Sequence, residues 1–81
     1  MDVHVRWFMR REEEKLWTPI EKADSIRLET HYNKWKQEEA SSKVVISTER
    51  LFEADFEEMK MKPIYWKDKF VNIRRYLACL P

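Results

Sequence analysis

The chain has 81 residues, a formal net charge of +1 and no glycine. This length predicts one small domain, which buries only roughly 60% of the surface that its unfolded chain exposes. The near balance of sixteen basic and fifteen acidic residues argues against a dedicated nucleic-acid-binding domain, which shows a clear basic excess. The absence of glycine excludes phosphate-binding glycine loops, dinucleotide fingerprints and the GxSxG nucleophile elbow.

The cysteine content and the absence of targeting signals point to the cytoplasm. Cys79 is the only cysteine, so no internal disulfide can form, which fits a reducing compartment. The N-terminus lacks the apolar core of a signal peptide, and no stretch approaches the roughly 18 apolar residues of a membrane span. The ending "ACLP" is no obvious natural stop, so we expect the chain to be part of a longer protein.

The first two predicted elements are the strands of a hairpin. Residues 3–9, "VHVRWFM", alternate at period two, which predicts a strand that is partly covered on both faces. The charged break at 10–15 predicts a turn. Residues 16–20, "LWTPI", predict a short strand, and Pro19 indicates that this strand lies at an edge or ends there.

A helix is predicted over residues 24–40. Asp24 or Ser25 is expected to cap its N-terminus. Leu28, Tyr32 and Trp35 form its apolar stripe, at i, i+4 and i+7, with Ile26 and His31 beside the stripe and charged residues on the opposite face.

The second half of the chain predicts more strands. Residues 44–47 and 51–56 are expected to pair through a tight turn at 48–50, and residues 57–62 fit either a turn or a strand. Residues 63–75, "PIYWKDKFVNIRR", are expected to contribute a strand at 64–66, a turn at 67–69 and the start of a strand at 70–77. The sum is an α+β fold, in which one helix covers one face of a strongly curved antiparallel sheet of about six strands.

Three residues in this order resemble the two tryptophans and the glutamate that name the WWE domain: Trp7, Trp17 in "LWTPI" and Glu29 in "IRLETHY". The segments "VRWF", "LWTPIEKADSIRLETHY" and "PIYWKDKFVNIRR" also resemble the N-terminal WWE-like region of the intracellular phosphatidic-acid-preferring phospholipases, the DDHD-domain family. The resemblance covers nearly the whole chain, so it implies one WWE-like domain at 1–81 that folds as a half-barrel. It also implies a mainly structural role for the family signature, which consists of Trp7, Trp17, Glu29, Trp66 and Arg74.

The resemblance implies a ligand pocket with unusual side chains. Some WWE domains hold the iso-ADP-ribose unit of poly(ADP-ribose) with two tyrosines, a glutamine and an arginine, and the matching positions hold Met9, Phe52, Met61 and Val71. These side chains supply neither hydrogen bonds for an adenine edge nor a cation for a pyrophosphate. We therefore expect weak or no binding of iso-ADP-ribose, and an apolar pocket that suits a hydrophobic side chain or a peptide.

Other candidate residues have less specific interpretations. Trp7 and Trp17 are expected in the core, with Trp17 also a candidate wall of the pocket. Glu29 is expected to cap a nearby backbone group or to pair with a surface lysine. Arg74 and Arg75 alternate along a strand and so face opposite sides, with Arg75 a candidate contact inside the cavity. An alternative use of residues 63–75 is a nucleic-acid patch, in which Tyr65 and Trp66 would stack on bases.

Three functional hypotheses follow from these residues and the resemblance. The first is a noncatalytic interaction module of an intracellular phospholipase, whose partner is another protein or the catalytic region of the same chain, with peripheral association at Golgi or ER membranes through the parent protein. The second is an ADP-ribose reader, and the third a lipid-headgroup-binding domain, which the balanced charge disfavours. No metal site is expected, because His4 and His31 lack a partner at helical spacing, and no cofactor is implied.

Overall fold

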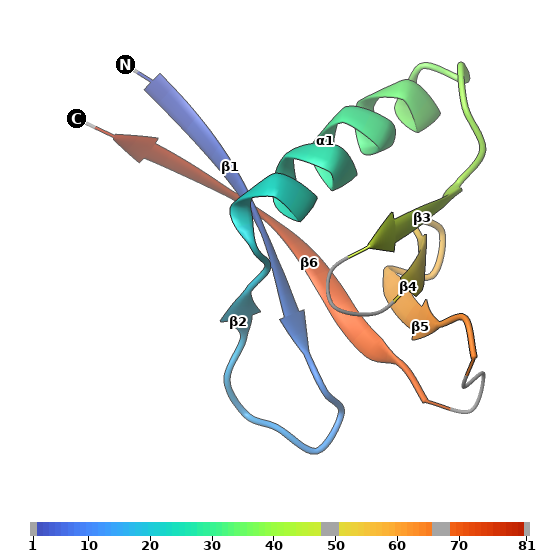
Figure 1. Cartoon of the computed structure of the whole chain (residues 1–81). Helices are drawn as coiled ribbons and strands as arrows, with labels where there is room; N and C mark the ends of the chain where they lie inside the picture. Colours follow the sequence, from blue (N-terminus) through green and yellow to red (C-terminus); the bar gives the residue numbers. More distant parts are fainter. Residues whose placement is uncertain (1, 48–50, 66–68, 81) are drawn as a thin grey trace.

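The computed structural model describes residues 2–47, 51–65 and 69–80, which form one curved antiparallel sheet and one helix (Figure 1). The elements in chain order are β1 (Asp2–Arg10), β2 (Thr18–Pro19), α1 (Lys22–Lys36), β3 (Lys43–Ser47), β4 (Leu51–Asp55), β5 (Lys60–Pro63) and β6 (Val71–Leu80). The strand order across the sheet is β2-β1-β6-β5-β4-β3, and the sheet is open, with β2 and β3 at its edges. The predicted α+β fold, with one helix between the second and third strands, is confirmed.

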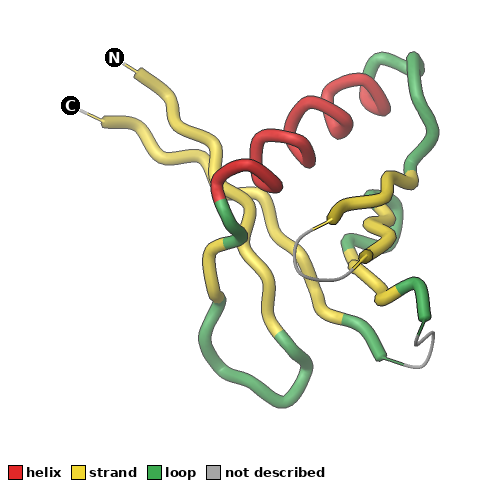
Figure 2. Tube along the Cα trace, in the orientation of Figure 1, coloured by secondary structure: helices red, strands yellow, loops and turns green. Residues whose placement is uncertain are grey.

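The longest pairing in the sheet joins β1 to β6. It runs antiparallel from Asp2 opposite Leu80 to Arg10 opposite Asn72, so the two ends of the chain lie side by side (Figure 2). The cartoon shows α1 lying across the concave side of the sheet, between the β1–β6 pair and β3 (Figure 1). The inner face of the sheet is therefore covered by the helix, whereas no described element covers its outer face.

The core lies between α1 and the inner face. Period-two alternation places Trp7 of β1 and Ile73 of β6 on this face, and both are buried with Leu28 of α1. Around Trp7 the rings of Tyr32, Phe56 and Trp35 form an aromatic cluster, in which Trp7 meets Tyr32 edge-on at 5.4 Å. Such rings bury large areas, which helps a domain of this size to remain folded. The full buried apolar set is Trp7, Ile20, Leu28, Val44, Ile46, Ala54, Phe56, Met61 and Ile73.

The helix begins and ends earlier than the predicted range of residues 24–40. It starts at Lys22, and its N-cap, Glu21, makes no side-chain capping hydrogen bond. Asp24 and Ser25 do not cap the helix as expected, because both lie inside its first turn and are buried. The Ser25 hydroxyl instead accepts a hydrogen bond of 2.9 Å from the backbone N–H of Trp7. Ile26, placed beside the apolar stripe, is 58% exposed.

Two residues next to regular elements adopt the left-handed backbone conformation although neither is glycine. Glu38, just beyond α1, has φ of 60°, and Met59, just before β5, has φ of 54°. At the helix end, the N–H of Glu38 bonds to the carbonyl of Trp35 and the N–H of Glu39 to that of Lys34. These paired bonds form the Schellman motif, which glycine usually closes. A chain without glycine must place ordinary residues in this region, at a cost of about 1–2 kcal/mol each.

The closing hairpin is present, but its first strand lies earlier than predicted. Residues 60–63 form β5, whereas Ile64 and Tyr65 lie in a turn. The second strand runs from Val71 to Leu80. The sequence pattern of residues 57–62 fits either a turn or a strand, because Met59 and Met61 alternate within a charged stretch. The predicted turn at 48–50, and the predicted strand residue Trp66 with turn residues 67 and 68, lie outside the described residues.

Candidate functional site

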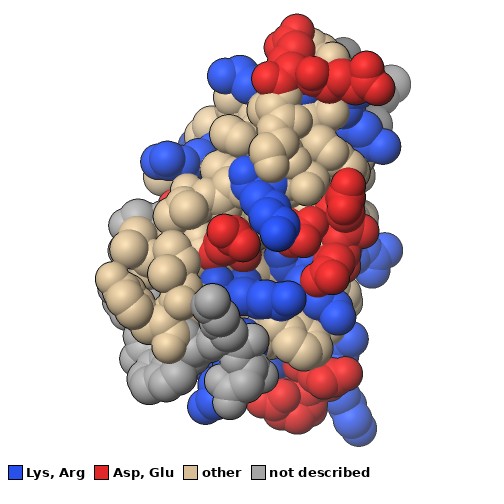
Figure 3. All heavy atoms as spheres, turned by 90° about the vertical axis from the view of Figure 1, so that its right-hand side faces the viewer, with Lys and Arg blue, Asp and Glu red and all other residues tan. Residues whose placement is uncertain are grey.

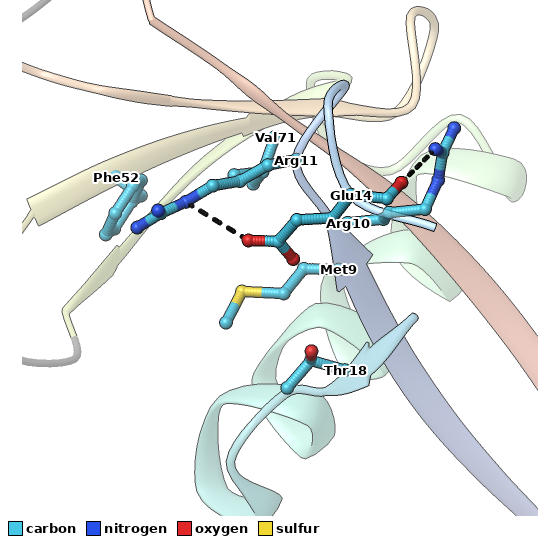
Figure 4. Close-up of a pocket in the computed structure, with 7 residues that line it drawn as sticks. All are labelled: Met9, Arg10, Arg11, Glu14, Thr18, Phe52 and Val71. Atoms are coloured by element: carbon cyan, nitrogen blue, oxygen red, sulfur yellow. Dashed lines mark hydrogen bonds and ion pairs between the residues drawn. The ribbon is translucent and has the colours of Figure 1, made fainter. Parts of the chain in front are cut away.

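A hollow of about 280 Å³ opens at the end of the half-barrel where β1 finishes (Figure 4). It takes side chains from β1, β2, β4, β6 and the loop that links β1 to β2. The lining residues are Met9, Arg10, Arg11, Glu14, Thr18, Phe52 and Val71. This volume lies just below the roughly 300–1,000 Å³ of most small-molecule sites and suits one or two apolar side chains.

Three of the predicted pocket residues form the apolar wall of the hollow. Met9, Phe52 and Val71 come from three different strands, and each lies on the inner face of the sheet and is partly buried. Met9 stands opposite Ile73 of the core, so the wall continues into the hydrophobic interior. In the close-up, the Arg11–Glu14 ion pair is seen between the Phe52 ring and the Met9 side chain (Figure 4).

Charged residues that the sequence interpretation placed in a surface turn also line the hollow. Arg10 donates a hydrogen bond of 2.7 Å from Nη1 to the backbone carbonyl of Glu14, which folds the loop back. The Arg11 Nε lies 3.9 Å from Glu14 Oε1, with both side chains well exposed, so this ion pair contributes little stability. The expectation of an apolar pocket therefore holds for Met9, Phe52 and Val71 but not for the whole hollow, because Arg11 and Glu14 also line it (Figure 4).

Arg75 does not line the hollow, because Glu29 holds its guanidinium. Arg75 Nε donates to Glu29 Oε1 at 2.8 Å, and its Nη2 donates to Oε2 at 2.6 Å, in a bidentate pair. Its guanidinium carbon also lies 5.1 Å from the centre of the Tyr32 ring. This arginine is thus committed to the contact between α1 and β6, and it is unavailable for a ligand in the hollow.

Glu29 joins α1 to the neighbouring strands β1 and β6. In addition to Arg75, it accepts hydrogen bonds from Trp7 Nε1 at 3.0 Å and from Asn33 Nδ2 at 3.2 Å. Hydrogen bonding from Arg75 is the largest cause that holds the pKa of Glu29 below its usual value, against the opposing effect of burial. The expected partner, a backbone cap or a surface lysine, is corrected to an arginine and an indole of the sheet.

The remaining predicted residues divide between the core and the outside of the domain. Met61 is 3% exposed and belongs to the core, so it is not a pocket contact. Trp17 is not a core residue: it is half-buried, and the guanidinium carbons of Arg10 and Arg74 lie 5.3 and 5.9 Å from its ring centre. Trp66 lies outside the described residues, so its predicted role is untested.

The face of the domain that Figure 3 shows carries mixed charge. In the space-filling view, lysines and arginines alternate with acidic residues (Figure 3). Within the described ranges, no group of three or more His, Cys, Asp or Glu side chains is placed to hold a metal ion. In the same ranges, α1 is too short and too polar to cross a bilayer.

Comparison with known proteins identifies one family. The sequence model of the WWE domain matches residues 4–75, which include the hollow, the Glu29 network and most of the sheet. No curated protein matches the chain in a sequence search.

Proposed function

This chain belongs to the WWE domain family, whose members are generally noncatalytic interaction modules, and we propose that it binds an apolar side chain of a protein partner in the hollow. The partner segment comes from another protein or from the catalytic region of the parent chain. The observation that supports this proposal is the wall of Met9, Phe52 and Val71, which faces a space of about 280 Å³. Burying one leucine or phenylalanine side chain there would contribute about 1.5–3 kcal/mol.

The charged residues at the margin of the hollow fit the same proposal. Arg11 and Glu14 are well exposed and offer donors and an acceptor to the backbone beside an inserted side chain. Interfaces of this kind have an apolar centre and a polar margin. The hollow therefore matches a peptide segment with one apolar anchor better than an isolated small molecule.

A selection from a displayed peptide library tests this proposal. We expect enriched peptides to share one large apolar residue and to lose binding by at least about tenfold when Val71→Glu places a carboxylate in the wall. The matched control is Val45→Glu, because Val45 is 42% exposed on β3, away from the hollow. Peptides that bind both variants equally, in domains shown to be folded by circular dichroism, would place the binding surface elsewhere.

Recognition of ADP-ribose is the second candidate, and Arg11 favours it. The Arg11 guanidinium is a cation at the margin of the hollow and could pair with a pyrophosphate there. Two observations weigh against it: Arg75 is paired with Glu29, and Met61 is buried in the core. A polar ligand whose buried groups found no partners would lose about 1–3 kcal/mol per group.

Calorimetry separates the two candidates. Titration of iso-ADP-ribose into the domain is expected to give no saturable heat up to about 1 mM, a range that corresponds to about −4 kcal/mol of binding free energy. Saturable micromolar binding that disappears in the Arg11→Ala variant would make nucleotide recognition the function of the hollow.

The parent protein is proposed to be an intracellular phospholipase of the DDHD type, with peripheral association at Golgi or ER membranes. The support is the order and spacing of "LWTPIEKADSIRLETHY" and "PIYWKDKFVNIRR". A full-length protein that contains this chain and lacks a serine hydrolase domain, or fails to hydrolyse phosphatidic acid, would contradict the proposal. Co-sedimentation of the domain with anionic liposomes tests direct lipid contact, and the net charge of +1 predicts weaker binding than that of a domain with a clear basic excess.

A further inference from the structure

The outer face of the β1–β6 ribbon carries arginines and aromatic rings. Arg6, Phe8 and Arg10 alternate on the outer face of β1, and the register places Arg74 opposite Phe8 and Tyr76 opposite Arg6. Trp17 adds its ring between Arg10 and Arg74. We call this surface the arginine–aromatic face; its members are Arg6, Phe8, Arg10, Trp17, Arg74 and Tyr76.

This face carries three arginines although the whole chain is nearly neutral. The described side chains of β1 and β6, residues 4–10 and 71–77, include no carboxylate. Among the described residues, Arg6 and Arg10 donate to the backbone carbonyls of Ile20 and Glu14, and neither they nor Arg74 makes a salt bridge. All three cations are arginines, whose planar guanidinium matches a carboxylate with two parallel hydrogen bonds.

The backbone positions of the three arginines match the side-chain repeat of an extended peptide. Arg6 and Arg10 are four residues apart on one strand, about 13 Å, and Arg74 starts from the position midway between them on the neighbouring strand. The arginines therefore recur about every 6.6 Å, which is the repeat of side chains on one side of an extended chain. Tyr76, 52% exposed, and Phe8 lie beside this row and offer apolar contact.

We propose that the arginine–aromatic face binds an extended acidic segment of a partner protein, in which carboxylates at alternate positions pair with Arg6, Arg74 and Arg10. This surface lies on the opposite side of the sheet from the wall of the hollow, and the proposal does not depend on what occupies the hollow. Arg10 borders both surfaces, whereas Arg6 and Arg74 belong to the arginine–aromatic face and do not line the hollow. Variants of Arg6 or Arg74 therefore test this face separately from the hollow.

The arrangement of the rings favours a peptide over single-stranded nucleic acid. Phe8 and Tyr76 meet edge-to-face at 86°, so they do not form a parallel platform for successive bases. The Trp17 ring is already faced by two guanidinium groups. The net charge of +1 also gives little of the general attraction to phosphates on which nucleic-acid binders depend.

Fluorescence anisotropy with a defined probe tests the proposal. The probe is a labelled peptide of about twelve residues in which Glu alternates with Thr, long enough to cover the row at about 3.3 Å per residue. We expect saturable binding that weakens with added salt, and no binding of the same peptide with Gln in place of Glu. No binding of the Glu peptide up to about 1 mM at low salt would overturn the proposal.

Two variants of Arg74 identify the surface. Arg74→Glu is expected to weaken binding by at least about tenfold, and Arg74→Lys to give an intermediate loss because the charge remains and the planar fork is lost. The matched control, Lys34→Glu, makes the same change of charge on the exposed side of α1 and is expected to change affinity less than about twofold. Equal losses in Arg74→Glu and Lys34→Glu would show a general charge effect and overturn the assignment.

A labelled oligothymidylate of about twelve nucleotides is the competing probe. Because the proposal assigns this face to a peptide, the oligonucleotide is expected to bind more weakly than the Glu peptide. Tighter binding of the oligonucleotide that is lost in Arg74→Glu would assign the face to nucleic acid and overturn the proposal. Circular dichroism of each variant confirms that the domain remains folded before its affinity is interpreted.

Discussion

A single carboxylate, Glu29, connects α1 to β1 and β6. It accepts two hydrogen bonds from Arg75 of β6 and one from Trp7 of β1. The side chains of Arg75 and Glu29 are 26% and 19% exposed, so the pair is shielded but not fully removed from water. Within the family signature, this glutamate and the first tryptophan are thus direct partners, and their joint role is to hold the helix on the sheet.

We predict that Glu29→Gln destabilises the domain by about 1–3 kcal/mol. The amide cannot accept two charge-assisted hydrogen bonds from Arg75, and the guanidinium is left without a countercharge. The partial exposure of the pair keeps the loss below the 3–5 kcal/mol of a fully buried pair. Urea denaturation measures the difference, and Glu13→Gln in the exposed loop is the control, with an expected change under about 0.5 kcal/mol. Equal midpoints for the two variants would contradict the assigned role of Glu29.

The same pair predicts a defined dependence on pH. Hydrogen bonding from Arg75 lowers the pKa of Glu29 in the folded state below its unfolded value of 4.5. The resulting stability is fully present above pH 4.5 and is lost as pH falls through the folded-state pKa. The stability difference between the wild type and Glu29→Gln should therefore shrink as pH falls from about 5 to 2. Because both proteins contain the other carboxyl groups, their contributions to the pH dependence of stability cancel in this difference. They include Asp24, whose pKa is raised mainly by burial. A difference that is constant over this range would contradict the prediction.

At the scale of elements, the end of α1 shows what the absence of glycine costs. The Schellman motif places Glu38 at φ of 60°, where a side chain is unfavourable. We predict that Glu38→Gly stabilises the domain by about 0.5–1 kcal/mol, because relief of the backbone outweighs the added entropy of the unfolded chain. Glu39→Gly has the same composition and removes the same charge, but Glu39 has negative φ, so this control is expected to lose stability. Thermal unfolding of both variants measures the effect, and a gain in both, or in neither, would contradict the explanation.

The elements that the sequence predicts well are those with local signals. Alternation from Val3 to Met9 predicts β1, the apolar spacing predicts α1, and Pro19 correctly marks β2 as an edge strand. The errors arise where tertiary contacts replace local rules. Ser25 looks like a helix cap because its hydroxyl suits that role, yet it bonds to the Trp7 N–H, eighteen residues away.

The site is predicted less completely than the fold, for a related reason. Met9, Phe52 and Val71 are found because their positions match those of known family pockets. Their charged neighbours, Arg10, Arg11 and Glu14, are missed because a charged turn usually remains in solvent, and here a hydrogen bond from Arg10 to the Glu14 carbonyl folds it back. The partner of Glu29 is 46 residues away in sequence, and no local pattern indicates such a pair.

At the scale of the whole molecule, the sheet separates two surfaces. Its inner face buries the core against α1 and ends in the hollow, and its outer face presents arginines and rings on the β1–β6 ribbon. Because successive side chains of a strand point to opposite faces, substitutions in the wall of the hollow leave the side chains of the arginine–aromatic face unchanged. The side chains of the hollow can therefore be changed by mutation while the backbone of the sheet is kept.

We therefore predict that substitutions in the hollow alone can create nucleotide binding. A triple variant would introduce polar side chains at three partly buried positions where the family's nucleotide binders have them: Met9→Tyr, Phe52→Tyr and Val71→Arg. Met61 stays unchanged because it belongs to the core. We expect this triple variant to bind iso-ADP-ribose with a Kd below about 1 mM, where the parent domain shows no saturable heat. The reason is that each charged hydrogen bond contributes about 1.5–3 kcal/mol once a partner is present. Val45→Arg adds the same charge on the exposed part of β3 and is expected to leave the domain without nucleotide binding. If the triple variant folds and still fails to bind, the shape of the hollow and not its side-chain chemistry excludes the nucleotide.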